Sequence, residues 1–127
     1  MKKLVYPATF EPDGEYIFVQ FPDIEEAFTQ GETVQEAYEM AEEVLGVVLA
    51  DRTEYPTASS LEKIIHDFPD KQIALVTIDL DLFRRKYRSK TIRKNISIPE
   101  WLNDLAIEHK INVSQVTTQA LKETLGI

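Results

Sequence analysis

The sequence predicts an α+β fold in two parts, a small sheet domain followed by a short strand–helix–helix module. Three observations support this prediction: alternating apolar residues near the N-terminus, an apolar stripe of helical period after residue 33, and an abrupt change of charge after residue 81. The chain has 127 residues, which is enough for one domain with a small appended module.

The first predicted elements are three strands. Apolar residues alternate over 4–10, as in a half-buried strand, and Pro12-Asp13-Gly14 has the composition of a tight turn in which glycine takes positive φ. Residues 16–21 are apolar on both faces, which favours a central strand. Residues 27–30 form a short third strand that ends at Gly31.

Two helices and a fourth strand complete the first part. Thr33-Val34-Gln35-Glu36 is a capping box that predicts a helix start. The apolar stripe of this helix consists of Val34, Ala37, Tyr38, Ala41, Val44, Leu45, Val48 and Leu49, with the glutamates toward solvent. A second helix is expected over 60–67, and 73–78 is typical of a buried strand. Residues 1–83 therefore form a small sheet domain with a helix on one face.

The net charge of −8, from 22 acidic and 14 basic residues, argues against nucleic acid when the chain is taken whole. Divided by segment, the net charge is −13 over residues 1–81, +7 over 82–99 and −2 over 100–127. Seven of the 14 basic residues lie in that middle segment, so the average conceals an acidic body and a basic one.

Composition excludes several kinds of site. The chain has no cysteine, so disulfides, thiolate metal sites and a cysteine nucleophile are ruled out. No apolar run approaches the roughly 18 residues that span a bilayer. We expect a cytoplasmic protein with no membrane contact and no cofactor.

The basic residues Arg84–Arg88 lie in a segment, 84–89, that we interpret as a linker. This linker either adds general attraction to phosphate or only keeps two acidic bodies apart.

Residues 90–99 have the period of a strand. Ile92, Ile96 and Ile98 share one face, with Lys94 interrupting it near the strand edge. The other face carries Thr91, Arg93, Asn95 and Ser97. Pro99 suits the first turn of a following helix, Asn112 suits the N-cap of a second helix, and Gly126 suits its end.

A strand and two short helices over 90–127 cannot bury enough surface alone, so we expect two copies to pair. Their strands would form an antiparallel ribbon that fits a DNA major groove. The expected base-reading residues are Thr91, Arg93, Asn95 and Ser97, and the expected phosphate-binding residues are Lys90, Lys94, Asn112, Val113 and Ser114. The expected dimer core is Ile92, Ile96, Ile98, Trp101, Leu105, Val116 and Leu121.

These residues resemble those of two known families. I-R-K-N-I-S-I-P-x-W-L at 92–102 and N-V-S-Q-V-x-x-x-A-L at 112–121 resemble a ribbon-helix-helix DNA-binding domain. Y-P-A-x-F-E-P-D-G at 6–14, F-P-D at 21–23, F-T-Q-G-E-T at 28–33, E-A at 36–37 and I-D-L-D at 78–81 are similar to the HicB antitoxins.

The resemblance implies a partial RNase H-like domain that binds and occludes HicA, a small mRNA-cleaving toxin, and a C-terminal domain that represses the operon encoding both. It implies no catalytic residue and supplies no motif for the toxin contact, so the toxin-binding residues stay unknown. Partners implied are the toxin, operator double-stranded DNA, and a second copy through residues 90–127, with a tetramer if the N-terminal sheets also pair.

Two alternatives stay open. Asp79 and Asp81, two residues apart in a strand, would share a face and could hold Mg²⁺ in an RNase H-like nuclease. The other alternative is a stand-alone repressor whose N-terminal domain senses a small ligand. His66 and His109 have no nucleophile arrangement nearby, which favours structural roles.

Overall fold

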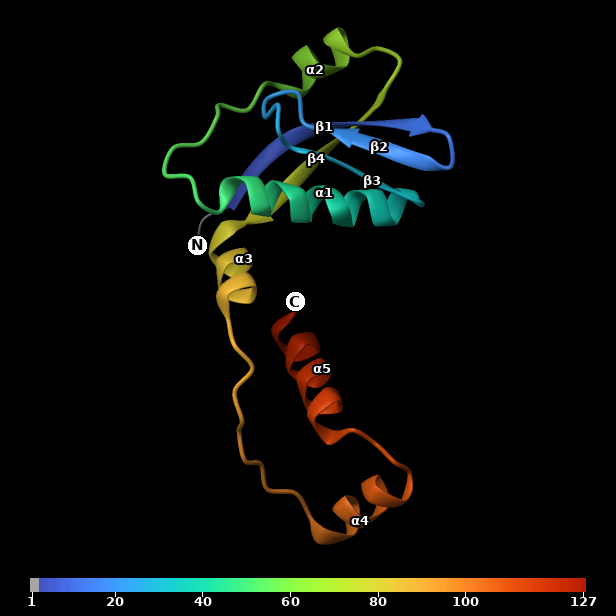
Figure 1. The fold of residues 1–127 in the computed structure, drawn as a ribbon, viewed down its shortest axis with the longest axis vertical. Helices are drawn as coiled ribbons and strands as arrows, with labels where there is room; N and C mark the ends of the chain where they lie inside the picture. Colours follow the sequence, from blue (N-terminus) through green and yellow to red (C-terminus); the bar gives the residue numbers. More distant parts are fainter. Residues whose placement is uncertain (1–2) are drawn as a thin grey trace. The chain divides into compact units, whose positions relative to one another are not determined.

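The computed structural model describes residues 3–127, and Figure 1 shows its fold. The chain divides into two compact units, with the boundary in the sequence between Lys90 and Thr91. The first unit contains β1 (Lys3–Asp13), β2 (Tyr16–Gln20), β3 (Phe28–Gly31), α1 (Val34–Leu49), α2 (Leu61–Asp67), β4 (Gln72–Asp79) and α3 (Leu80–Arg88). The second contains α4 (Glu100–Glu108) and α5 (Val113–Leu125). Among the described helices, none is long and apolar enough to cross a membrane.

The four strands form one antiparallel sheet in the order β3-β2-β1-β4. β1 lies in the interior of the sheet and pairs with β4 along its first eight residues, Lys3 opposite Asp79 through Phe10 opposite Gln72. β2 is also interior, as its apolar pattern predicts. The turn between β1 and β2 has Gly14 at φ 63°, which confirms the predicted turn glycine.

The core lies between α1 and one face of the sheet, as Figure 1 shows. Small and apolar residues of α1, namely Ala37, Ala41, Leu45 and Leu49, are buried together with Tyr6, Ala8, Phe10, Val19 and Val76 of the sheet. The predicted capping box is present, because the Thr33 side chain accepts a hydrogen bond from the Glu36 N–H at 3.1 Å. Val34 is an exception to the predicted stripe: it opens the helix and is exposed.

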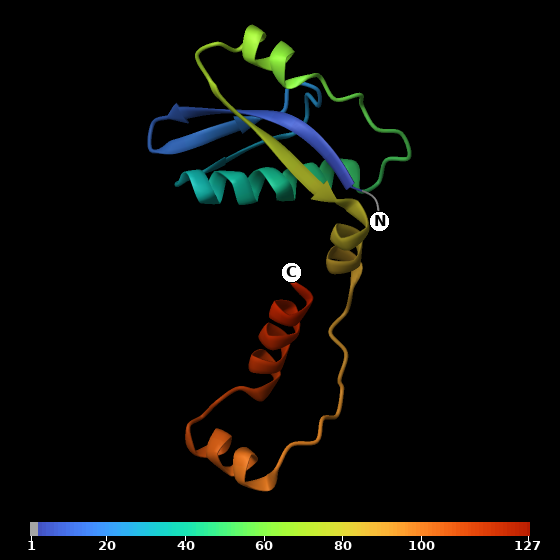
Figure 2. The same ribbon diagram turned by 180° about the vertical axis from the view of Figure 1, so that it is seen from behind.

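The opposite face of the sheet is also covered, so β1 is buried on both faces at its centre and not on one face only, as its alternating pattern predicts. Pro7 and Thr9 of β1 are buried, because α2 and the segment before it lie over this face, as seen from behind in Figure 2. That segment is fixed by Asp23, whose carboxylate accepts hydrogen bonds from the Ser59 N–H at 2.8 Å and hydroxyl at 2.5 Å. Ile64 of α2 is buried there.

Residues 80–88 form a helix, α3, and the expected linker over 84–89 is therefore wrong for most of its length. The Phe83 ring packs on Gly46 of α1, where a Cβ atom would lie only 2.5 Å from the ring. The Arg84 guanidinium donates to the Ala50 carbonyl at 2.9 Å and to the Tyr55 hydroxyl at 3.1 Å. The high density of basic residues obscures the amphipathic pattern of this segment in the sequence, so the sequence does not predict a helix there.

The strand geometry expected for Asp79 and Asp81 is also wrong. Asp79 ends β4 and caps α3, since its carboxylate accepts a hydrogen bond from the Leu82 N–H at 3.1 Å. Asp81 lies in the first turn of the helix, 3.9 Å from Arg84. A helix start therefore replaces the shared strand face on which a metal-binding pair would depend.

The second unit contains two helices joined by a tight turn. Lys110 has φ 55°, and the Ile111 N–H donates to the Ala106 carbonyl across it, which ends α4. The Asn112 side chain accepts from the Gln115 N–H at 3.0 Å, which confirms the predicted N-cap, and Gly126 has φ 75°. Between Ser89 and Pro99 the structure has no strand, so the strand expected over residues 90–99 is absent from the single chain.

Gly46→Ala is expected to destabilise the first unit by about 1 kcal/mol. The gain in helix propensity, about 1 kcal/mol, is smaller than the cost of overpacking against Phe83, roughly 1–3 kcal/mol. Urea unfolding followed by tyrosine near-ultraviolet circular dichroism measures this, because every tyrosine lies within residues 6–87. In a Phe83→Ala background the same change should be neutral or stabilising; a cost that persists there would contradict the packing account.

Candidate functional site

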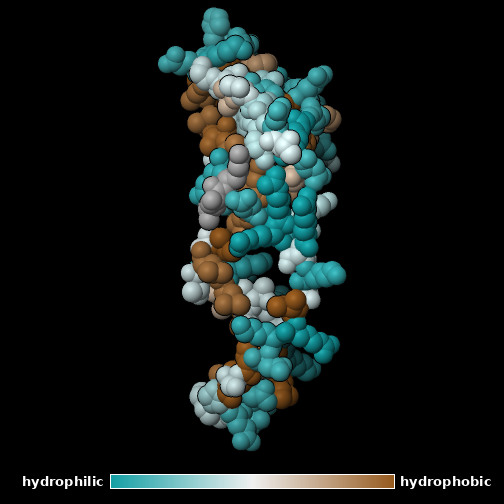
Figure 3. Space-filling model, turned by 90° about the vertical axis from the view of Figure 1, so that its left-hand side faces the viewer, coloured by the Kyte–Doolittle hydropathy of each residue, from teal (hydrophilic) through white to brown (hydrophobic). Residues whose placement is uncertain are grey.

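Residues 91–127 contain no buried side chain in the single chain. The exposed large hydrophobic residues of this unit are Ile92, Ile96, Ile98, Trp101, Leu102, Leu105, Ile107, Ile111, Val116, Leu121, Leu125 and Ile127. Ile92 is 81% exposed and Trp101 64%. Figure 3 shows hydrophobic side chains (brown) in its lower half, the part of the picture that α4 and α5 occupy in Figure 1. So much exposed apolar surface on a unit without a core indicates an interface.

The seven residues expected to form a dimer core are all on this surface. Ile92, Ile96 and Ile98 lie in the extended segment before α4, which we call the arm (residues 90–98). Trp101 and Leu105 are one helical turn apart on α4. Val116 and Leu121 lie on α5. Their exposure leaves them available to a second chain.

The polar residues of the arm are exposed too. Thr91, Arg93, Asn95 and Ser97 alternate with the isoleucines, and Lys90 and Lys94 flank them. Within residues 3–127, Arg93, Lys94 and Asn95 take part in no ion pair or side-chain hydrogen bond. At the start of α5, Val113 and Ser114 present first-turn N–H groups, which suit an anion.

The basic residues of α3 are less available than a linker would make them. Arg84 is held by Ala50 and Tyr55, and Arg88 donates to the Asp51 carboxylate at 2.8 Å. Arg85 and Lys86 have no such bond within the described residues. Half of the expected phosphate-attracting cluster therefore serves to hold α3 on the first unit.

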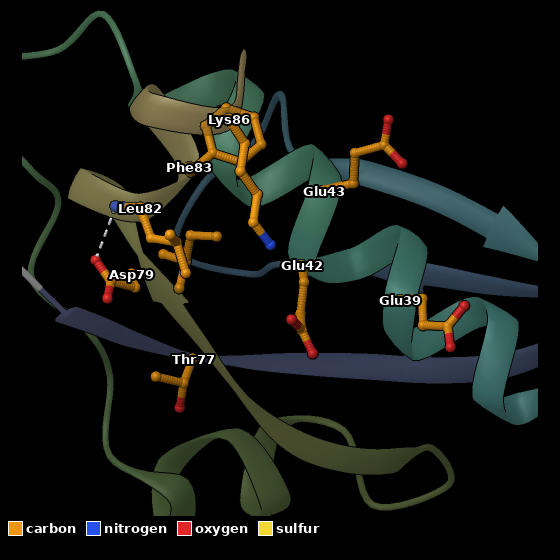
Figure 4. Close-up of a pocket in the computed structure, with 9 residues that line it drawn as sticks. Glu39, Glu42, Glu43, Thr77, Asp79, Leu82, Phe83 and Lys86 are labelled. Atoms are coloured by element: carbon orange, nitrogen blue, oxygen red, sulfur yellow. Dashed lines mark hydrogen bonds between the residues drawn. The ribbon is translucent and has the colours of Figure 1, made fainter. Parts of the chain in front are cut away.

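A groove lies where α1, the end of β4 and α3 meet, and we call it the α1–α3 groove (Figure 4). Its volume is about 410 Å³. Its lining residues are Glu39, Glu42 and Glu43 from α1, Thr77, Ile78 and Asp79 from β4, and Leu82, Phe83 and Lys86 from α3. Apolar side chains thus lie beside a row of carboxylates.

The electrostatics of the groove centre on Glu42. Burial raises the pKa of its carboxyl, the nearby Glu39 raises it further, and Lys86 on α3 lowers it. In Figure 4 the Lys86 ammonium extends toward Glu42, while the Glu43 carboxylate points away from the helix into solvent. The charge of Glu42 is therefore only partly compensated in the free chain.

The outer edge of β4 is covered at its centre by Tyr38 of α1. The Tyr38 hydroxyl donates to the Leu75 carbonyl at 3.0 Å, and the Thr77 backbone donates a hydrogen bond back to it. Burial, followed by the charge of Glu42, raises the pKa of this hydroxyl. β4 pairs with β1 on its other side, so this hydroxyl occupies groups that another strand would need.

No group of three or more His, Asp or Glu side chains within residues 3–127 is placed to hold a metal ion. His66 lies in the last turn of α2 and His109 caps the C-terminus of α4, and neither lines the groove. The sequence does not predict the groove, because the spacing of the α1 glutamates predicts a solvated helix face. Had α3 been predicted as a helix, the positive charge of Lys86 would have indicated that this helix faces the α1 glutamates.

The family described as HicB-like antitoxin of bacterial toxin-antitoxin systems matches residues 6–121. No curated protein matches at a significant level.

Three solved structures are similar to the chain. A structure described as a toxin–antitoxin complex from Streptococcus pneumoniae is 30% identical, with a TM-score of 0.55, and covers 97% of this chain and 99% of that one. The antitoxin HicB of Burkholderia pseudomallei is 24% identical, with a TM-score of 0.52, over 96% and 98%. The N-terminal domain of that antitoxin is 26% identical, with a TM-score of 0.51, over 61% and 100%.

Tyr38→Phe is expected to lower the free energy of unfolding by about 0.5–1.5 kcal/mol, because it removes the hydroxyl that covers Leu75 and Thr77. It should also promote self-association, since the edge of β4 is then open. Urea unfolding and size-exclusion chromatography with light scattering measure both.

Stability should also depend on pH through Tyr38. Its pKa is higher in the folded chain than the ordinary 10.0, so ionisation favours the unfolded state as pH rises above about 10. The unaltered chain should lose stability in that range more steeply than Tyr38→Phe. Parallel pH profiles of the two proteins would contradict this assignment.

Proposed function

The chain belongs to the family of HicB-like antitoxins of bacterial toxin–antitoxin systems, and from this premise we propose that it neutralises a HicA-like mRNA-cleaving toxin and represses its own operon. Residues 1–83, a partial RNase H-like domain, bind and occlude the toxin in the cytoplasm. Residues 90–127 form a ribbon-helix-helix domain that pairs two chains and binds operator DNA. The chain performs no catalysis.

The observation that carries the DNA-binding half of this proposal is the missing core of residues 91–127. An arm and two helices that expose isoleucines, a tryptophan and leucines become stable when a second copy supplies the other side of the core. Pairing two arms in an antiparallel ribbon would satisfy the backbone of residues 91–98, which has no hydrogen-bond partner among the described residues of the single chain; the Lys90 carbonyl accepts only the Ser89 hydroxyl.

The side chains on the other face of that ribbon suit base edges. Arg93 can donate to guanine O6 and N7, and Asn95 can pair with adenine N6 and N7, with Thr91 and Ser97 beside them. Lys90, Lys94 and the first turn of α5, at Asn112, Val113 and Ser114, supply contacts to phosphate.

The observation that supports toxin binding by the first unit is its charge. The net charge of −13 over residues 1–81 attracts a basic, RNA-binding protein and competes with RNA for it. The alternative of a nuclease built on Asp79 and Asp81 loses its geometric basis, because Asp79 is occupied as the cap of α3. A ligand-sensing repressor is separated from an antitoxin by the experiment below.

The proposal is tested by expressing the chain together with the short basic reading frame next to its own. We expect that frame to arrest growth alone, and the chain to restore growth and co-purify with its product. Growth arrest that the chain does not relieve, or an adjacent product that never co-purifies, would leave a stand-alone repressor as the better account.

Arg93→Ala is expected to weaken binding to DNA from the chain's own promoter by about 1–3 kcal/mol and to relax base preference at one position. Lys90→Ala is the matched control, because loss of a phosphate contact weakens binding to all sequences alike and lowers the salt dependence by about one ion. Electrophoretic mobility shifts on promoter and scrambled DNA measure both. Unchanged affinity and selectivity of Arg93→Ala would remove it from the base-reading set.

Leu105→Asp is expected to convert the dimer into a monomer and to abolish promoter binding, because it places a carboxylate in the shared core. Ile107→Asp, on another face of α4, is the control and should keep both properties. Light scattering gives the mass, and four chains in the unaltered protein would show that the N-terminal sheets also pair. A Leu105→Asp protein that stays dimeric would contradict the proposed core.

A further inference from the structure

We propose that the α1–α3 groove is the place where the toxin docks, and that its occupant is a toxin segment carrying a lysine or arginine side chain. This inference rests on the proposed function, and it assigns the contact surface that the family resemblance leaves open.

The shape and chemistry of the groove suit a long cationic side chain. Its apolar part, formed by Ile78, Leu82 and Phe83, can pack the methylene groups of lysine or arginine. Glu39, Glu42 and Glu43 of α1 also line the groove, and the carboxylates of Glu39 and Glu42 offer partners for the charged end, whereas that of Glu43 points into solvent. A phosphate or another anion would be repelled by the same row.

The chain itself already places a cation in this groove. Lys86 extends its ammonium toward Glu42 from the opposite wall, and its charge acts on that carboxyl (Figure 4). One ammonium does not compensate three glutamates and Asp79, and within the described residues neither Glu42 nor Glu43 forms a salt bridge. The groove therefore retains negative charge for a partner's cation.

The ionised carboxylate of Glu42 is energetically unfavourable in the free chain. Burial and the neighbouring Glu39 raise the pKa of its carboxyl, so its ionised form is less stable there than in water. A partner cation placed beside it would reverse this effect. The charge of Glu42 thus destabilises the free chain and would stabilise a complex in which a partner's cation lies beside it.

The edge of β4 indicates how the partner binds. The Tyr38 hydroxyl already occupies the Leu75 carbonyl and the Thr77 amide, so strand addition at the centre of β4 is blocked. Contact in the groove is accordingly through side chains. It also involves α3 directly, because Leu82, Phe83 and Lys86 form one wall.

The test compares two triple variants of the full chain that change the net charge equally. Glu39→Gln/Glu42→Gln/Glu43→Gln alters the groove, and Glu15→Gln/Glu25→Gln/Glu54→Gln alters exposed residues outside it. The probe is the purified product of the adjacent basic reading frame, titrated onto the immobilised chain. The groove variant should weaken binding at least about tenfold, mainly through faster dissociation, and the control less than about threefold.

A second comparison has the opposite sign. Lys86→Gln removes the internal cation and should tighten binding of the same probe by about threefold at low salt. Lys63→Gln, with the same charge change on α2, should have no comparable effect. If toxin binding required only that the first unit be folded, loss of the glutamates and loss of Lys86 would not change the affinity in opposite directions.

Folding is checked independently of binding. The groove variant should unfold at the same or a higher urea concentration than the unaltered chain at pH 7, because the charge of Glu42 disfavours the folded state. A lower urea midpoint combined with weaker binding would attribute the loss to misfolding, and the inference would then have to be abandoned unless Lys86→Gln still tightened binding.

The outcomes separate this inference from the function on which it rests. If the unaltered chain does not bind the probe, both fail. If it binds and the two triple variants weaken binding equally, attraction by the whole unit replaces docking in the groove. If the groove variant binds normally but loses self-association of the chain, the occupant is a second copy. Either of the last two results overturns the inference and leaves the antitoxin function standing.

Discussion

The exposed apolar surface of residues 91–127 is the constraint on which the proposed architecture depends. Two helices of 9 and 13 residues, with no side chain buried, cannot offset the entropy of ordering a chain. In the proposed architecture a second copy supplies the missing core, and the same association places two arms side by side. Dimerisation and DNA recognition are therefore one event in this account, because the ribbon exists only when the core does.

Helix α3 connects the two parts of the chain to which the proposed functions are assigned. It is docked on the acidic unit by Phe83 on Gly46 and by Arg84 on Ala50 and Tyr55, and it ends two residues before Lys90, where the arm begins. It also forms one wall of the α1–α3 groove. In the proposed function, the opposite charges of the two parts let one chain attract a basic protein and an acidic nucleic acid to different surfaces.

Most local structure was predictable because it is set by residues close in sequence. The capping box at Thr33, the glycine turn at Gly14 and the N-cap at Asn112 each depend on contacts within a few residues, and all three are confirmed. The errors involve contacts between distant segments. α3 was missed because its docking surface is on α1, and the groove was missed because it exists only where three elements meet. The arm is a different case, since the strand predicted there is absent from the single chain and the partner we propose for it is a second copy.

Hydrogen–deuterium exchange of the full-length chain, free, with the toxin and with promoter DNA, tests the division of labour most directly. We expect the toxin to slow exchange in α1, the end of β4 and α3, and DNA to slow exchange in residues 90–98 and in the first turn of α5. Protection of the arm by the toxin alone, or of α1 by DNA, would contradict that division of labour.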